Sequence, residues 1–353
     1  MPKQIALQSP MAIPQISVVQ TKLLDRYVLP KVAMVLILVS SAAGAWLTLR
    51  GAGDARADLV LAKWAYFVSL SIVLGGGLWG AYFAKSSYEE QDIDAPSGFL
   101  RLEYDGFATI QRYAMLAMLG AGAYVLVGYS VLFGTTFAPW YNGIAGIQGI
   151  LWLLLAGAVA ATLTDLGKAG PSWLSKRQQW LKLTVLLSLL TLIATAALDV
   201  IPYHGASGPA ILARWVHLSA FGVWFGGAVW NVFVAVPAAR KTLNFETVFA
   251  AAAQLDQFRR VVRFALPLVL VTGLFQAYGL IGLNFSALTV LPVGPLLLAK
   301  VGLIISLVAI FLACPMWRAC SPISGVCDIT DLDPTPSSPK PNGHAGGLIR
   351  HHT

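Results

Sequence analysis

Residues 64–80, WAYFVSLSIVLGGGLWG, decide the fold of this chain, because residues 215–231, WVHLSAFGVWFGGAVWN, repeat their pattern 151 positions later without a gap. Trp64 matches Trp215, and the central glycines and the last tryptophan match as well. The same interval pairs Lys31 with Lys182, Lys63 with Arg214, Asp105 with Asp256, Phe107 with Phe258, Arg112 with Arg263 and Gly122 with Gly273. A register kept through loops as well as helices predicts an internal duplication.

The composition is that of an integral membrane protein. The 353 residues are 57% hydrophobic and 11% charged, and their mean hydropathy is +0.70, whereas soluble domains carry about a quarter charged residues. Stretches apolar and long enough to cross a bilayer as helices cover residues 30–49, 58–84, 107–134, 143–163, 181–200, 212–237, 261–283 and 291–313. Because lipid leaves no partner for backbone polar groups, we predict an all-α, polytopic membrane protein with eight transmembrane helices in two tandem four-helix repeats.

The predicted organisation has five parts: a cytoplasmic N-terminal segment (1–29), a first membrane repeat (30–163), a cytoplasmic linker (164–180), a second membrane repeat (181–313) and a flexible cytoplasmic tail with cysteines (314–353). Basic residues gather on one side of the predicted helices, while the connections at 134–143 and 282–292 carry none. The positive-inside rule then puts both termini in the cytoplasm. This asymmetry accounts for the net charge of +8, so membrane lipid is a predicted partner and nucleic acid is not.

Ionisable residues inside the predicted spans are the first candidates for function, because they are costly there unless paired or hydrated. His217 and Lys300 stand out, and His204 and Asp199 lie just outside, between the fifth and sixth helices. We expect Lys300 to pair with Asp199 or with helix-terminal carbonyls. At the repeat interval Tyr66 stands opposite His217, and Lys300 is opposed by a glycine, so only the second repeat keeps the polar set.

The second repeat carries one further pattern. It consists of Arg214-Trp-Val-His217, Trp224-Phe-Gly226-Gly227, Phe258, Thr272-Gly273 and Gly294-Pro-Leu-Leu-Leu-Ala-Lys300. Over about residues 210–312 the chain thereby resembles the copper resistance D (CopD) family of bacterial inner-membrane proteins. The resemblance implies that the protein moves copper across the bacterial cytoplasmic membrane or handles copper there. It also implies a periplasmic copper-binding protein or other membrane subunits as partners.

Copper sites use imidazole, thioether and thiolate ligands. His217 and His204 are the predicted metal ligands, although a structural histidine and a plain loop residue are the alternatives. Met115 and Met118 are one turn apart. They either offer thioether sulfurs as copper ligands or are ordinary packing residues. Cys314, Cys320 and Cys327 lack the close C-x2-C spacing of a zinc site and are candidate Cu(I) acceptors in the tail.

Three functions remain open from the sequence. Copper transport or handling follows from the family resemblance. A b-type cytochrome is the second, with haem b as cofactor, but only His217 of the histidines lies within a predicted span. The third is a non-catalytic scaffold subunit of a larger membrane complex. We do not predict an enzyme, and the chain has no GxxxxGK[ST] run through which a P-loop would bind ATP.

Overall fold

The computed structural model describes residues 28–51, 56–84, 97–132, 143–163, 173–204, 207–242, 245–282, 286, 288 and 294–313. Every element in these ranges is helical. In chain order they are α1 (Val28–Gly51), α2 (Ala57–Leu78), the π-helix η1 (Trp79–Phe83), α4 (Ser97–Leu132), α5 (Gly143–Leu163), α6 (Trp173–His204), α7 (Gly208–Val229), the π-helix η2 (Trp230–Ala235), α8 (Val236–Lys241), α9 (Phe245–Ile281) and α11 (Gly294–Ala313).

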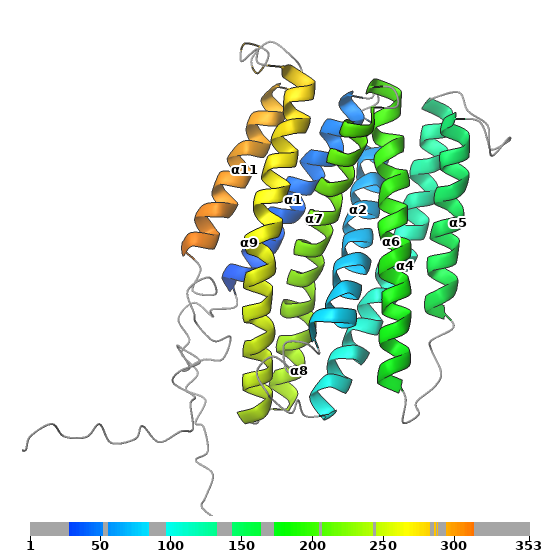
Figure 1. Cartoon of the computed structure of the whole chain (residues 1–353). Helices are drawn as coiled ribbons and strands as arrows, with labels where there is room; N and C mark the ends of the chain where they lie inside the picture. Colours follow the sequence, from blue (N-terminus) through cyan, green and yellow to red (C-terminus); the bar gives the residue numbers. More distant parts are fainter. Residues whose placement is uncertain are drawn as a thin grey trace, which may run out of the picture.

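The helices lie side by side and run up and down the molecule (Figure 1). Five helical segments are long and apolar enough to cross a membrane: Ala57–Phe83, Gly98–Gly128, Lys176–Ile201, Gly208–Lys241 and Phe249–Gly279. Three shorter apolar helices, Val32–Leu47, Gly146–Ala161 and Gly294–Ala309, lie in α1, α5 and α11. The predicted all-α class is therefore confirmed, together with helices suited to a membrane.

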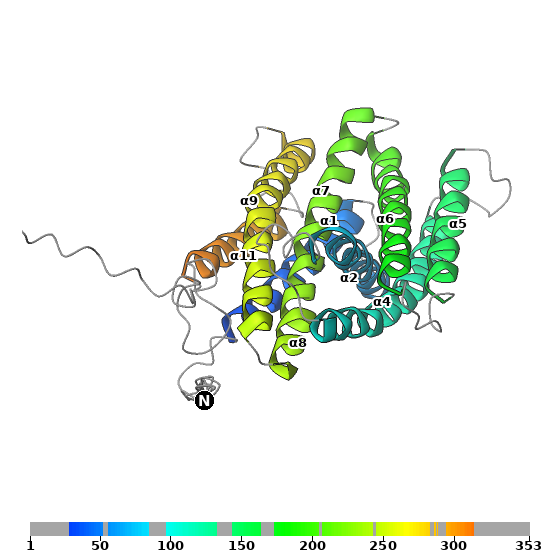
Figure 2. The ribbon, with the colours of Figure 1, turned by 60° about the horizontal axis from the view of Figure 1, so that its bottom comes forward.

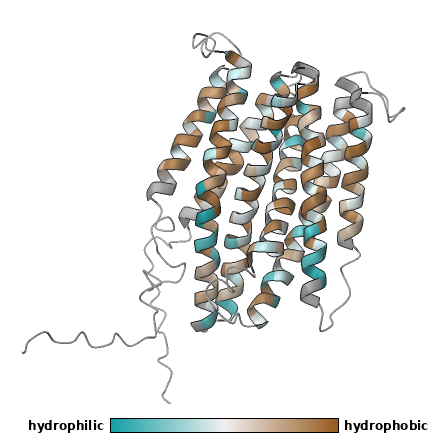
Figure 3. Cartoon of the chain, in the orientation of Figure 1, coloured by the Kyte–Doolittle hydropathy of each residue, from teal (hydrophilic) through white to brown (hydrophobic). Residues whose placement is uncertain are grey.

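Three helices begin earlier than hydropathy predicts. α4 starts at Ser97, α6 at Trp173 and α9 at Phe245, so parts of the predicted polar connections are helical. In α4 the added turns bury Phe99, Glu103 and Phe107 while Arg101 and Asp105 stay exposed. This four-residue spacing buries one face of the helix. The charged residues on the other face lower the average hydropathy of the segment, so a hydropathy profile does not detect these turns. Figure 3 shows hydrophilic residues gathered in the lower part of α6 and in the lower half of α9, above its lower end.

Two helices cross at the centre of the molecule. α2 packs against α7, and Figure 2 shows α2 enclosed by α4, α6 and α7. The crossing is tight because glycine meets glycine: a Cβ on Gly75 would lie 2.7 Å from the Cα of Gly226, and one on Gly226 would lie 2.5 Å from the Cα of Gly75. Small residues allow such close backbone approach between membrane helices.

The remaining helices surround this crossing. α4 packs on α2, and α9 packs on α7. α5 lies against α6, and α1 lies against α11. Each of the last two contacts joins a helix of the predicted first repeat to a helix of the predicted second repeat. The helices of the two repeats are therefore interleaved within the described ranges.

One end of the molecule carries α8, and the π-helices η1 and η2 lie near it; we call it the α8 end. Here Trp79 packs on Phe258 with ring centroids 5.8 Å apart, and Trp230 packs on Phe107 at 5.0 Å. Trp230 stands 151 positions after Trp79, and Phe258 stands 151 positions after Phe107. The other end, where α6 meets α7, we call the far end.

Candidate functional site

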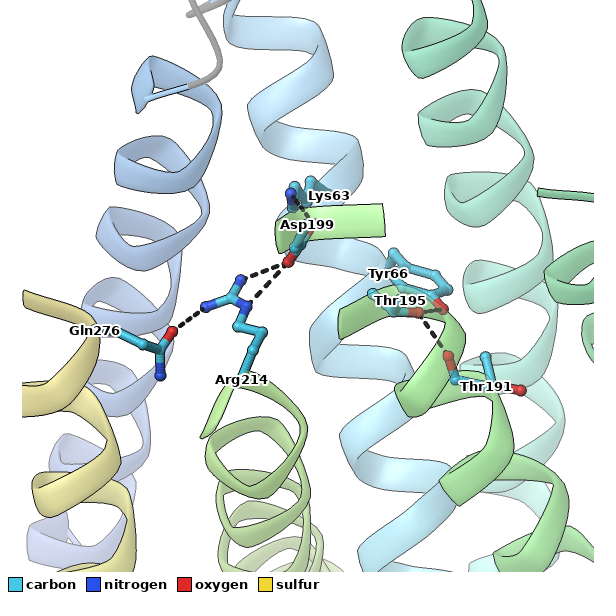
Figure 4. Close-up of polar contacts among 7 residues, drawn as sticks. All are labelled: Lys63, Tyr66, Thr191, Thr195, Asp199, Arg214 and Gln276. Carbon is cyan, nitrogen blue, oxygen red and sulfur yellow. Dashed lines mark hydrogen bonds and ion pairs between the residues drawn. The ribbon is translucent and has the colours of Figure 1, made fainter. Parts of the chain in front are cut away.

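A buried carboxylate at the far end holds two cations (Figure 4). Asp199, near the end of α6, accepts a bond from Lys63 Nζ of α2 at 2.7 Å. Its second oxygen accepts bonds from Arg214 of α7, from Nη2 at 2.7 Å and from Nε at 3.0 Å. The side chains of Lys63 and Asp199 are 1% and 2% exposed, and that of Arg214 is 14% exposed. Charges this deeply buried are tolerated only when they are paired and hydrogen-bonded.

The network extends to a fourth helix. Arg214 Nη1 donates to Gln276 Oε1 of α9 at 3.1 Å, and Gln276 Nε2 donates to the carbonyl of Thr272 at 3.1 Å. The ring of Phe67 lies beside both cations, 5.7 Å from Lys63 Nζ and 5.7 Å from the guanidinium carbon of Arg214. The face of an aromatic ring attracts a cation at this range. The four residues Lys63, Asp199, Arg214 and Gln276, which we call the far-end network, thus tie α2, α6, α7 and α9 together.

A second polar pair lies one turn deeper. The hydroxyls of Tyr66 and Thr195 are 2.8 Å apart, and Thr195 Oγ1 donates to the carbonyl of Thr191 at 2.8 Å. Because a threonine hydroxyl has one proton, Tyr66 must be the donor to Thr195. Both residues border a cavity in which the centre of a water-sized sphere has about 10 Å³ of space, which is about the minimum for one water molecule. Its walls are Lys63, Tyr66, Phe67, Gly122, Val125, Leu126, Leu151, Thr195, Leu198 and Asp199.

His217 is anchored through one ring nitrogen. Its Nδ1 lies 3.1 Å from the carbonyl of Val269 and 3.0 Å from Thr272 Oγ1. Thr272 donates its own proton to the carbonyl of Leu268 at 2.6 Å, so both neighbours of Nδ1 are acceptors and Nδ1 carries the hydrogen. The lone pair is therefore on Nε2, for which no hydrogen bond is seen among the described residues. A histidine held in this way keeps the lone pair of Nε2 available for another partner.

The predicted pairing of Lys300 with Asp199 is wrong. Asp199 is taken by Lys63 and Arg214, while Lys300 on α11 reaches α1, where a Cβ on Gly44 would lie 3.3 Å from Lys300 Nζ. Within the described residues Lys300 makes no hydrogen bond or ion pair, and its side chain is half-buried. The sequence could not place it, because α11 packs on α1 and not on α6.

The two predicted copper ligands lie at different depths. His204 is the last residue of α6, five positions beyond Asp199, and its side chain lies outside the described part of the structure. His217 lies three positions beyond Arg214, toward the interior of α7. With Arg214 bonded to Asp199, a rise of 1.5 Å per residue separates the two backbones by about 12 Å in depth. They do not share one level of the molecule.

The sulfur residues take separate places. Met115 and Met118 are buried in a hydrophobic cluster with Tyr66, Leu155 and neighbouring apolar side chains, as their packing alternative predicts. Cys314, Cys320 and Cys327 lie outside the described residues. Among the described residues no group of three or more His, Cys, Asp and Glu side chains is arranged to hold a metal.

Sequence reasoning missed the role of Lys63. The sequence held a signal for this role, because Lys63 stands at the repeat position of Arg214 and both are basic residues inside the first turns of predicted apolar helices. A charge at that depth needs a partner, and the partner lies 136 residues away. No family model matches the chain, and no curated protein or solved structure is significantly similar to it.

Proposed function

We propose that the chain is a duplicated membrane protein whose eight apolar helices all span the bilayer. The proposal is supported by contacts that recur at the 151-residue interval. Gly75 meets Gly226, and Glu103 is hydrogen-bonded by Gln254, which is its own counterpart. The indole of Trp64 donates to the carbonyl of Leu38, and that of Trp215 donates to the carbonyl of Leu189. Equivalent residues that meet each other mark an axis relating two copies.

We further propose that the protein handles or transports copper at the bacterial cytoplasmic membrane. The observation that carries this proposal is the orientation of His217, whose Nδ1–H is held by Val269 and Thr272 so that Nε2 is left as a ligand. Copper accepts imidazole nitrogen readily. In this proposal copper is the cargo of the protein, and the resemblance of residues 210–312 to the CopD family is the second support.

The depths of the histidines suggest the order of events. His204 ends α6 at the far end, where a periplasmic copper-binding protein would deliver the ion if both termini are cytoplasmic. His217 lies deeper, beyond the far-end network. The two histidines then act one after the other, and each needs further ligands from groups outside the described residues or from the delivering protein.

A copper titration of the purified protein tests this proposal. We expect His217→Ala to weaken Cu(I) affinity by about tenfold or more, since even losing a group that only orients a ligand costs 10–100-fold in metal affinity. Tyr66→Phe is the matched control, because Tyr66 occupies the equivalent position in the first repeat and is a poor copper ligand. Competition with a chromophoric Cu(I) chelator measures the Cu(I) affinity of both variants and of the parent protein. Equal copper binding by both variants and the parent would refute the role of His217.

A scaffold subunit is the second candidate function. It is favoured by the lack, within the described residues, of a three-residue metal-binding group. Purification in mild detergent would then yield a stable complex with other membrane subunits and no copper. The haem b alternative is tested by the same preparation, since bound haem gives a strong Soret absorption.

A further inference from the structure

The two halves of the chain, residues 28–163 and 173–313, meet differently at the two ends of the molecule. At the far end the halves share buried polar side-chain contacts beside apolar ones, since Leu198 of the second half and Leu126 and Leu151 of the first half line the same cavity. Lys63 of the first half bonds to Asp199 of the second, and Tyr66 of the first half bonds to Thr195 of the second. The cavity with room for about one water molecule lies between these two contacts.

In the middle of the interface the backbones of α2 and α7 are in direct contact. Gly75 and Gly226 are so close that a Cβ on either would overlap the other helix. Helices in such contact pivot against each other more readily than they separate, because separation would open a void along the whole crossing.

At the α8 end the halves are joined by large buried rings. Trp79 packs on Phe258, and Trp230 packs on Phe107; all four side chains are buried. Beside them the amide of Gln254 donates to both carboxylate oxygens of Glu103, at 2.8 and 3.0 Å. Parting this end would expose a large apolar area, which is costly in the presence of water.

We propose that the far end is a gate that opens by parting Lys63 from Asp199, with the glycine crossing as pivot and the aromatic end staying closed. When the far end parts, water can replace the bond between Lys63 and Asp199, whereas parting the rings of the α8 end exposes apolar surface with no such replacement, so the far end opens first. Asp199 keeps Arg214 when Lys63 leaves, because both belong to the second half. Opening connects the far-end solution to Tyr66, Thr195 and the cavity. The gate rests on the proposed membrane arrangement and is independent of copper.

Thiol labelling of the full-length protein in sealed vesicles tests the gate. The native residues Cys314, Cys320 and Cys327 are replaced by serine, and a reporter is introduced by Val125→Cys on the cavity wall. The probe is a charged, membrane-impermeant methanethiosulfonate reagent. Adding Lys63→Met should raise the labelling rate about tenfold, roughly the effect of removing one hydrogen bond from a two-state equilibrium. Lys63→Arg, which keeps the charge, should label at the parental rate.

Two matched variants make the result decisive. Ala81→Cys puts a reporter at the buried α8 end, and it should stay protected when Lys63→Met is added. Tyr66→Phe removes the other polar contact with little change in shape, and it should raise labelling of Val125→Cys even if Lys63→Met fails to fold. Unchanged labelling in both, or an equal rise at Ala81→Cys, would overturn the gate. Labelling from the opposite membrane side would contradict the proposed orientation and leave the gate intact.

Discussion

Asp199 is bonded to cationic side chains from two helices. We therefore expect its replacement to affect the stability of the far end more than that of any other single residue there. One oxygen binds Lys63 and the other binds Arg214. Each bond is charge-assisted and sheltered from solvent, so its strength is greater than that of a surface pair. Replacing the carboxylate leaves two buried cations facing a neutral group.

We expect Asp199→Asn to lower the free energy of unfolding by about 3–5 kcal/mol, as breaking a buried ion pair does. Asp58→Asn is the control, because Asp58 accepts from Tyr124 at an exposed site and its loss should cost less than about 1 kcal/mol. Unfolding in mixed detergent micelles measures both. Similar losses in the two variants would show that the far-end network contributes little to stability.

His217 illustrates how a residue gains a role from its neighbours. Any histidine offers two nitrogens, but the acceptors Val269 and Thr272 take one of them. Both acceptors belong to α9, so the packing of α9 on α7 determines the tautomer of His217. Tyr66, which stands 151 positions before His217, instead donates to a hydroxyl of α6, so the side chains at these two positions differ in chemistry.

Among the helices, α2 and α7 determine how the others are arranged. Their central glycines permit contact between backbones, and each helix then passes into a π-helix at a tryptophan, Trp79 in η1 and Trp230 in η2. A π-helical turn shifts the helix face. Here the shift accompanies the packing of each tryptophan on a phenylalanine of the other half.

We expect Gly226→Ala to destabilise the protein by at least about 1–3 kcal/mol, the usual cost of overpacking. The added Cβ would lie 2.5 Å from Gly75 Cα and 2.5 Å from the carbonyl oxygen of Ser71, both backbone atoms. Gly157→Ala on α5 meets nothing within 4 Å and should be neutral or stabilising by up to about 1 kcal/mol. Thermal unfolding of the two variants side by side gives the comparison; a stable Gly226→Ala would mean that the crossing can widen freely.

At the scale of the whole molecule, the two halves are interleaved. α5 of the first half lies on α6 of the second, and α11 of the second lies on α1 of the first. The central crossing joins α2 to α7 as well. Neither half therefore buries its own helices completely, and each depends on the other for packing.

Splitting the chain tests this dependence. We expect residues 1–168 and 169–353, expressed together, to purify as one complex through a tag on either piece, because the contacts between halves do not need a continuous chain. Each piece expressed alone should be degraded or aggregate. Recovery of either piece alone as a stable, folded monomer would contradict the interleaved arrangement.

The sequence by itself determined the class of the protein and most of its helices. Long apolar stretches require helices in lipid, so the all-α class and the segments around Trp64 and Trp215 could be predicted from composition and spacing. The beginnings of α4 and α9 could not, because their buried faces alternate with charged residues such as Arg101 and Asp256. Hydropathy averages over both faces and therefore misses them.

Only the tertiary structure decided which charges meet. Lys63 and Asp199 are 136 residues apart, and no local pattern links them, whereas the sequence offered Asp199 as one of two predicted partners of Lys300. Depth is readable from sequence because helix rise is constant, but the neighbour at that depth depends on how helices pack around the Gly75–Gly226 crossing. Packing is a property of all the side chains together, so the polar partners at the far end follow from the fold and not from any one stretch of sequence.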